Sequence, residues 1–267
     1  MQNLIVTFIQ TELAWEDIQA NLEMLDEKIE AIQNPTDLIL LPEMFSTGFS
    51  MNPDGLAETM HGSAVAWMMK KATEKSADIT GSLMIEEDWH YFNRLIWAKP
   101  DGRMLTYDKR HLFRMTGEEK VYSAGNHRLT VELKGWRIRP FICYDLRFPV
   151  WMRNSDNPYD LAIVTANWPA SREIQWQTLL RARAIENQSY VIGVNRVGMD
   201  GNQIEYNGYS CVVDYQGNIH FQEVGQENTQ TASLSSTTLR NYRDSLPFWK
   251  DRDAELDGLF HESNETA

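Results

Sequence analysis

The sequence predicts a single α/β domain, and three observations carry this prediction. Short, β-branched apolar segments alternate along the chain with amphipathic helical segments. No internal repeat, low-complexity block or Pro/Gly/Ser-rich linker divides the chain. Its 267 residues are 42% hydrophobic and 24% charged, which is the profile of an ordinary folded protein. A chain of this length and class commonly forms one domain.

The first half of the chain alternates predicted strands and helices. Residues 4–9 (LIVTFI) are almost continuously apolar, as in a strand buried on both faces. Apolar residues at spacings of three and four predict a helix over 18–32, ended by Asn34 and Pro35. Residues 37–42 form a second buried strand, stopped by its proline. The same patterns predict a helix over 64–74 and strands over 79–85, 91–98 and 104–107.

The second half predicts a hairpin, three strands and a helix. The hairpin joins 129–133 to 136–142, the strands cover 159–166, 190–195 and 209–215, and the helix covers 173–187. The domain is expected over 1–247, followed by a tail over 248–267. That tail is charged but carries five large apolar residues, Phe248, Trp249, Leu256, Leu259 and Phe260. We therefore expect it to dock on the domain or on a partner chain.

Charge and cysteine content exclude several functions. The 38 acidic and 25 basic side chains give a net charge of −13, which argues against sequence-independent binding of nucleic acid. No apolar run approaches the roughly 20 residues that a membrane-spanning helix needs. The N-terminus lacks the features of a secretory signal. The two cysteines, Cys143 and Cys211, are too few for a disulfide framework, so we expect a cytoplasmic protein.

Three reactive side chains follow three separate predicted strands. Glu43 follows the strand over 37–42, Lys109 follows 104–107, and Cys143 follows 136–142. Ligands of open α/β sheets bind in the crevice outside the carboxyl ends of the strands. A carboxylate, an ammonium and a thiol at three such ends therefore predict a catalytic site.

These residue types suit nucleophilic attack on a carbonyl carbon. The thiol of Cys143 must lose its proton to attack, and Glu43 is placed in the chain to accept it. Lys109 would supply positive charge for the thiolate and for the oxyanion that forms. Residues 144–149 predict a tight turn into a helix, whose backbone N–H groups would favour the same negative charges.

Each residue also has an ordinary structural interpretation. A cysteine that ends a buried strand is usually an inert small apolar residue, and Cys211 keeps that interpretation. Glu43 alone could be a surface carboxylate, and Lys109 a solvated lysine. Their joint placement favours a catalytic site.

Three segments resemble the signature segments of the carbon–nitrogen hydrolase (nitrilase) superfamily. They are 41–49 (LPEMFSTGF), 107–113 (YDKRHLF) and 143–149 (CYDLRFP), in the family's order and at comparable spacing. The resemblance runs from the first strand to about residue 247. Within the superfamily, 135–138 (GWRI), 166–169 (ANWP) and 181–188 (RARAIENQ) most resemble the bacterial omega-amidases of the YafV type.

The resemblance implies a four-layer α-β-β-α sandwich and a Glu–Lys–Cys triad. Glu43 would be the base, Lys109 the partner of thiolate and oxyanion, and Cys143 the nucleophile that forms a thioester. The Tyr144 backbone N–H would also contact the oxyanion. The family carries a supporting glutamate that matches Glu118 or Glu119, and we favour Glu118. Family members usually pair, so a homodimer is expected.

The resemblance further implies a 2-oxo dicarboxylic acid monoamide as substrate, such as 2-oxoglutaramate or 2-oxosuccinamate. The distal carboxylate of such a substrate needs a local cation on this acidic protein. We predict Arg172 for that role and Trp168 as a pocket wall. The alternatives are a solvated arginine near a helix start and a tryptophan packed in the core.

Two rival functions stay open at this point. The same triad serves carbamoylases, nitrilases, other amidases and N-acyltransferases, because the triad fixes the bond attacked and not the pocket. A catalytically silent binding or scaffold protein of this fold is the other alternative. The six histidines show no zinc-site spacing, and no glycine-rich nucleotide loop is present, so no metal and no cofactor are predicted.

Overall fold

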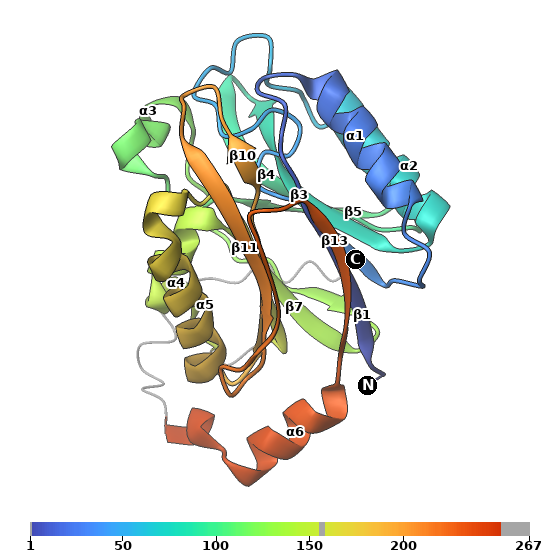
Figure 1. The fold of residues 1–267 in the computed structure, drawn as a ribbon, viewed down its shortest axis with the longest axis vertical. Helices are drawn as coiled ribbons and strands as arrows, with labels where there is room; N and C mark the ends of the chain where they lie inside the picture. The colour runs from blue at the N-terminus through green and yellow to red at the C-terminus, as the bar shows by residue number, and fades with distance from the viewer. Residues whose placement is uncertain (1, 155–157, 252–267) are drawn as a thin grey trace.

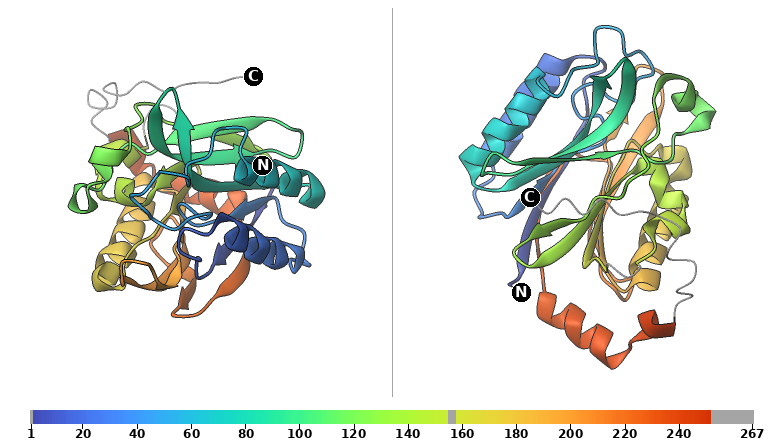
Figure 2. Two further views of the ribbon diagram at one scale, coloured as in Figure 1. Left: turned by 90° about the horizontal axis from the view of Figure 1, so that it is seen from above. Right: turned by 180° about the vertical axis from the view of Figure 1, so that it is seen from behind.

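The strands form two sheets that pack face to face between helices (Figure 1). The computed structural model describes residues 2–154 and 158–251. The helices are α1 (Ile18–Glu30), α2 (Ser63–Lys75), α3 (Glu118–Val121), α4 (Pro149–Met152), α5 (Glu173–Asn187) and α6 (Ser236–Ser245). Helices α1 and α2 cover one outer side, and α4 and α5 lie on the opposite side (Figure 2).

The first sheet has the order β13-β1-β2-β3-β4-β5. Strands β1, β2 and β3 are parallel, and the other neighbours are antiparallel. Its members are β1 (Leu4–Gln10), β2 (Leu38–Leu40), β3 (Asp78–Glu87), β4 (His90–Ala98), β5 (Met104–Asp108) and β13 (Asn228–Leu234).

The second sheet has the order β10-β11-β9-β8-β7-β6, and β12 also pairs with β11. Strands β7, β8 and β9 are parallel. Its members are β6 (Val131–Leu133), β7 (Trp136–Ile142), β8 (Leu161–Thr165), β9 (Tyr190–Val194), β10 (Val197–Met199), β11 (Glu205–Val213) and β12 (Ile219–Val224).

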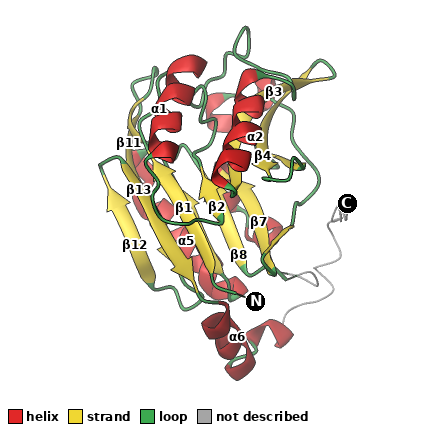
Figure 3. Ribbon diagram, turned by 90° about the vertical axis from the view of Figure 1, so that its right-hand side faces the viewer, coloured by secondary structure: helices red, strands yellow, loops and turns green. Residues whose placement is uncertain are grey.

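Strand β2 shows why its segment is apolar at every position. Leu38 and Leu40 belong to the core between the two sheets, whereas Ile39 and Leu41 belong to the core under α1 and α2. Successive side chains of a strand point to opposite faces, so a strand in the middle of four layers needs apolar residues on both. Figure 3 shows α1 and α2 lying across this sheet. The predicted four-layer sandwich is confirmed.

Helix α5 packs closely on the second sheet. Trp176, Leu180 and Ala184 recur every four residues and are fully buried. A Cβ atom at Gly193 of β9 would lie 2.6 Å from Leu180 and 2.7 Å from Trp176, so only glycine allows this approach. Arg183 then donates hydrogen bonds of 3.1 and 2.8 Å from Nε and Nη2 to the carbonyl oxygen of Leu146. The helix thereby holds the turn after β7.

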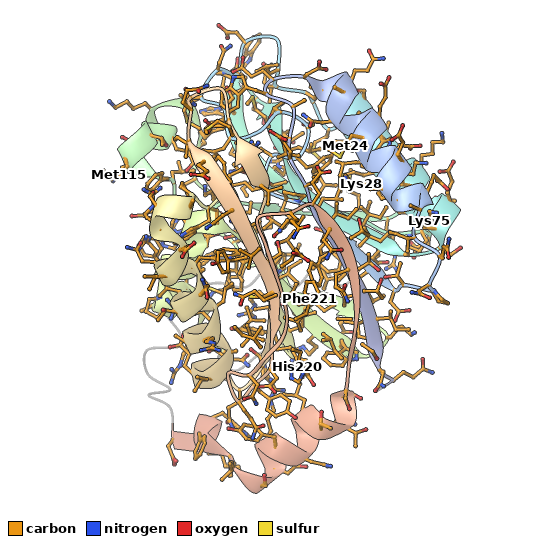
Figure 4. The ribbon with its side chains drawn as sticks, in the orientation of Figure 1. Met24, Lys28, Lys75, Met115, His220 and Phe221 are labelled. Atoms are coloured by element: carbon orange, nitrogen blue, oxygen red, sulfur yellow. The ribbon has the colours of Figure 1, made fainter. Side chains whose placement is uncertain are left out.

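The sequence patterns did not predict β10, β12, β13 and α6. Strand β13 (NTQTASL) is polar, and its pairing comes from β1, which it follows in antiparallel register from Leu234 opposite Leu4 to Asn228 opposite Gln10. Phe221 of β12 contacts Phe8 at a ring distance of 5.4 Å (Figure 4). These strands are specified by tertiary pairing, which a local apolar pattern does not record.

The tail is described only to residue 251. Phe248 and Trp249 are 58% and 47% exposed, and the Trp249 backbone N–H donates to Gln188 Oε1 at 3.3 Å. The other apolar tail residues, Leu256, Leu259 and Phe260, lie outside the described residues. Docking of the tail therefore stays a prediction. In the two described ranges no helix has the length and apolarity required to cross a membrane.

Candidate active site

The three strand-end residues meet at one place between the two sheets. Glu43 comes from the turn after β2 and Lys109 from the end of β5, both in the first sheet, whereas Cys143 follows β7 of the second. The side chains of Glu43 and Lys109 are fully buried, and Cys143 is partly exposed. The Cys143 thiol donates a long hydrogen bond of 3.9 Å to the carbonyl oxygen of Asn167, and the negative charge of Glu43 acts on the sulfur.

A buried carboxylate–ammonium–carboxylate cluster lies beside the thiol. Lys109 Nζ is 2.9 Å from Glu43 Oε1, 2.9 Å from Glu118 Oε1 and 3.0 Å from Glu118 Oε2. Of the two glutamates left open by the sequence, Glu118 is buried in this cluster and Glu119 is exposed. Asn93 Nδ2 joins both carboxylates, at 2.9 Å from Glu43 and 3.3 Å from Glu118.

Asn167 holds the other side of Glu43. Its backbone N–H donates to Glu43 Oε2 at 2.8 Å, and its Nδ2 donates to the Glu43 carbonyl oxygen at 2.7 Å. The sequence alone predicts no role for Asn93 or Asn167. Asn93 and Arg94 interrupt the apolar residues of β4, and Asn167 follows the end of β8. Polar residues within or just after an apolar strand were the only sequence features that could have pointed to these two asparagines.

Cys143 opens a tight turn with an unusual backbone. Its φ angle is +42°, in the left-handed region that a residue with a Cβ rarely adopts. The five residues Cys143–Arg147 form a 3₁₀ turn, and the short helix α4 follows. The predicted helix start is thus a 3₁₀ turn.

Burial controls the charges of the cluster. Burial alone would lower the pKa of Lys109, but the charges of Glu118 and Glu43 outweigh it and hold that pKa above its usual value. Burial raises the pKa of Glu118, against the opposing charge of Lys109. Lys109 therefore stays protonated between its two carboxylates.

Cys143 differs from the expectation of a stabilised thiolate. Burial, then the negative charge of Glu43, raise the pKa of the Cys143 thiol well above 9.0, and Lys109 only partly opposes them. The single ammonium is already matched by two carboxylates. The raised pKa favours the neutral thiol at neutral pH.

A pocket opens on the Cys143 thiol. Its lining comes from six segments: Phe49, Lys109, Phe113, Thr116, Cys143, Tyr144, Arg147, Asn167, Trp168, Pro169, Arg172, Ile204 and Tyr206. The predicted substrate-binding residues Trp168 and Arg172 are among them, and so is Tyr144, whose backbone N–H was predicted to contact the oxyanion. Trp168 is also 3% exposed and packs against Trp176 at 5.4 Å, so the pocket and core interpretations both hold.

Two arginines border the pocket. The guanidinium of Arg172 lies 5.3 Å from the centre of the Phe113 ring, and that of Arg147 lies 4.9 Å from the Trp168 ring. The sequence predicts a role for Arg172 but none for Arg147, although Arg147 is four residues from Cys143. Within the described residues no group of three or more His, Cys, Asp or Glu side chains is placed to hold a metal ion.

An α-β-β-α sandwich with a thiol beside a buried Glu–Lys–Glu cluster is the arrangement that the sequence resemblance implied. The chain belongs to the carbon–nitrogen hydrolase family, whose model matches residues 5–244. The predicted class of enzyme, one that hydrolyses carbon–nitrogen bonds, is thereby confirmed.

Individual relatives are similar over nearly their whole length. The omega-amidase YafV of Yersinia enterocolitica is 49% identical over 259 residues, which cover 96% of this chain and 99% of that protein. The 2-oxoglutaramate amidase of Bacillus subtilis is 30% identical, with 92% and 96% covered. A CN-hydrolase superfamily protein of Xanthomonas campestris, crystallised with an arsenic adduct in its active site, is 44% identical with a TM-score of 0.93, over 95% and 98%.

Proposed function

We propose that the protein is an omega-amidase. It hydrolyses the terminal amide of a 2-oxo dicarboxylic acid monoamide, such as 2-oxoglutaramate or 2-oxosuccinamate, to the 2-oxo acid and ammonia. One observation carries the proposal: the same pocket is lined by Cys143 and by the two arginines Arg147 and Arg172. The 49% identity to an omega-amidase over 96% of the chain supports it.

Acylation starts with a proton transfer. Glu43 takes the thiol proton as the Cys143 sulfur attacks the amide carbon, and the carbon–oxygen double bond becomes an oxyanion. Lys109 and the Tyr144 backbone N–H stabilise that oxyanion. The tetrahedral species collapses when Glu43 returns the proton to the leaving nitrogen. Ammonia leaves and a Cys143 thioester remains.

Deacylation repeats these steps with water. Glu43 takes a proton from the water, the resulting hydroxide attacks the thioester carbon, and the sulfur leaves as the carboxylic acid forms. The proton on Glu43 returns to the Cys143 sulfur. Glu118 keeps the Lys109 ammonium in place and protonated throughout, which its two short contacts with Nζ support.

The substrate's distal carboxylate binds the two arginines. Arg172 is the primary partner and Arg147 the second. Arginine suits this role because its guanidinium makes bidentate hydrogen bonds to a desolvated carboxylate. Trp168 forms a wall for the carbon chain between the two ends.

The protein is also proposed to form a homodimer and to be cytoplasmic. Exposed apolar residues on α4 and α5 support a homodimer paired there: Val150, Ile174 and Ile185 are 53%, 73% and 52% exposed. Sedimentation of the protein with Ile174→Glu and Ile185→Glu tests this pairing. A cytoplasmic location is proposed because the mechanism needs a reduced Cys143 thiol.

Release of ammonia from three compounds tests the function. We expect turnover of 2-oxoglutaramate to exceed that of N-carbamoyl-β-alanine and of an aliphatic nitrile by at least about 100-fold. Turnover of either of the last two in preference would identify another carbon–nitrogen hydrolase. Cys143→Ala should abolish the activity; activity that persists in this variant would refute Cys143 as the nucleophile. Absence of turnover on all three would favour the silent scaffold.

A further inference from the structure

Asp145 lies two residues after Cys143, and its side chain is completely buried. The proposed mechanism does not use it. We infer that Asp145 is a positioning residue that fixes the Cys143 turn relative to the Lys109 segment. This inference rests on the proposed role of Cys143 as the nucleophile.

The Asp145 carboxylate accepts four hydrogen bonds. Oδ1 accepts from the His111 backbone N–H at 3.0 Å and contacts His111 Nδ1 at 2.8 Å. Oδ2 accepts from the Tyr107 hydroxyl at 2.6 Å and from the Ile142 backbone N–H at 3.1 Å. A buried carboxylate with this many donors is held in one orientation.

These partners surround both reactive residues. Tyr107 and His111 flank Lys109 at two residues on either side. Ile142 and Asp145 itself flank Cys143. Because Lys109 leaves the first sheet and Cys143 leaves the second, no strand pairing fixes the distance between them. The Asp145 carboxylate is a direct tie between the two segments, at the level of the reacting groups.

Neighbouring groups keep this tie rigid. Trp151 Nε1 donates to the Tyr107 hydroxyl at 3.0 Å, so that hydroxyl has its own proton free for Asp145. The His111 ring stacks on Phe148 with a centroid distance of 3.6 Å and an interplanar angle of 5°. Both contacts come from the segment that follows the Cys143 turn. Residues that follow the Cys143 turn therefore hold both Tyr107 and His111, the two residues of the Lys109 segment that contact Asp145.

The conformation of Cys143 explains why such a tie is needed. A left-handed φ of +42° costs free energy and persists only where the surroundings impose it. The bond from the Ile142 N–H to Asp145 spans this residue and closes the turn. A shift of the sulfur by about 1 Å is enough to lower a catalytic rate by about 100-fold.

Asp145→Asn tests the inference with the smallest change in shape. The amide keeps one acceptor oxygen but loses the charge and the second acceptor. We expect kcat on 2-oxoglutaramate to fall about 100-fold. The KM should stay within about threefold, because Asp145 does not line the pocket where the distal carboxylate binds. The rate at which iodoacetamide alkylates Cys143 should change in parallel with kcat.

Asp214 offers a matched control. It is 5% exposed and its carboxylate also accepts four hydrogen bonds, from two backbone N–H groups, Asn218 Nδ2 and His220. It lies in the turn between β11 and β12, and its partner His220 is well away from Met115, which precedes α3 (Figure 4). Asp214→Asn should lower the melting temperature and leave kcat within about twofold.

A second variant covers the case in which Asp145→Asn does not fold. Tyr107→Phe removes one donor to Asp145 and leaves the carboxylate in place, and we expect about a tenfold fall in kcat with unchanged KM. If Tyr107→Phe, and Asp145→Asn where it folds, lower only the melting temperature and leave kcat and the alkylation rate unchanged, the inference is overturned.

The alkylation measurement separates this inference from the proposed function. If the wild-type protein does not hydrolyse 2-oxoglutaramate, the omega-amidase proposal fails. The effect of Asp145→Asn on the reactivity of Cys143, compared with that of Asp214→Asn, still tests the tie.

Discussion

The Glu43 carboxylate and the Lys109 ammonium form a 2.9 Å ion pair in which neither side chain is exposed. The two residues are 66 positions apart in the chain and end two strands of the same sheet, β2 and β5. Glu118 and Asn93 occupy the remaining sides of this pair. A carboxylate that is buried against a cation is held in one position, and the other Glu43 oxygen is fixed by the Asn167 N–H. This arrangement suits the repeated proton transfer that we propose for Glu43.

Glu43→Gln should lower kcat by about 10²–10⁴-fold, because the amide has the same shape but accepts no proton. The KM for 2-oxoglutaramate should change little, since Glu43 is not among the residues that line the pocket. Steady-state measurement of ammonia release checks both values. Glu119→Gln, an exposed neighbour of Glu118, is the control and should leave kcat unchanged. A Glu43→Gln variant with normal kcat would mean that another base operates.

Lys109→Met should destabilise the protein by about 3–5 kcal/mol, since it leaves two carboxylates buried without their cation. Urea unfolding at neutral pH measures this free energy. Lys71→Met is the comparison: Lys71 is also buried and contacts Asp26, Glu30 and Glu74, but these carboxylates are 41–52% exposed and water can solvate them. We expect a clearly smaller loss there. Equal losses would contradict the account of the buried cluster.

Much of this architecture could be predicted, because many of its strands and helices have a characteristic local pattern of apolar residues. Strand β2 is apolar at every position, since it is buried on both faces, and α5 begins and ends at the predicted residues 173 and 187. Strand β13 could not be predicted, because its polar residues become a strand only by pairing with β1.

In the candidate site, too, some features could be predicted from the sequence and others depend on the fold. Glu43, Lys109 and Cys143 could be found because each follows an apolar strand. The choice between Glu118 and Glu119 could not be made, because the two are adjacent in the chain and only the fold buries one of them. The raised pKa of Cys143 was also beyond the sequence, because it depends on how deeply the fold buries the sulfur and on how many carboxylates share the ammonium of Lys109.

Arg172→Met should raise the KM for 2-oxoglutaramate by about 10–100-fold, since a charged hydrogen bond to the distal carboxylate contributes about 1.5–3 kcal/mol. Arg147→Met should act in the same direction. Both variants should hydrolyse an aliphatic monoamide that lacks the carboxylate as well as the wild type does. Arg240→Met, on the exposed side of α6, is the control and should leave every constant unchanged. If only Arg147→Met raises the KM, Arg147 and not Arg172 is the carboxylate partner.

The alkylation rate of Cys143 should rise with pH without a plateau near neutrality. Iodoacetamide reacts with the thiolate, and burial together with the charge of Glu43 raises the pKa of this thiol well above 9.0. The thiolate fraction, and with it the rate, then increases about tenfold per pH unit from pH 7 to 9. Mass spectrometry of the labelled protein measures the rate. A plateau at or below pH 7 would mean a resting thiolate and would contradict this electrostatic account.

Cys211 and Glu43 supply the two controls for this measurement. Cys211 is 1% exposed, and burial raises its pKa to about 12, so it should be labelled only after unfolding. Glu43→Gln removes the negative charge beside the sulfur, which lowers the pKa of Cys143 and should make alkylation at pH 7 faster. The same substitution is expected to slow amide hydrolysis. Opposite changes in the two rates would separate the reactivity of the sulfur from proton transfer to the leaving nitrogen, a step that only a base at position 43 performs in the proposed mechanism.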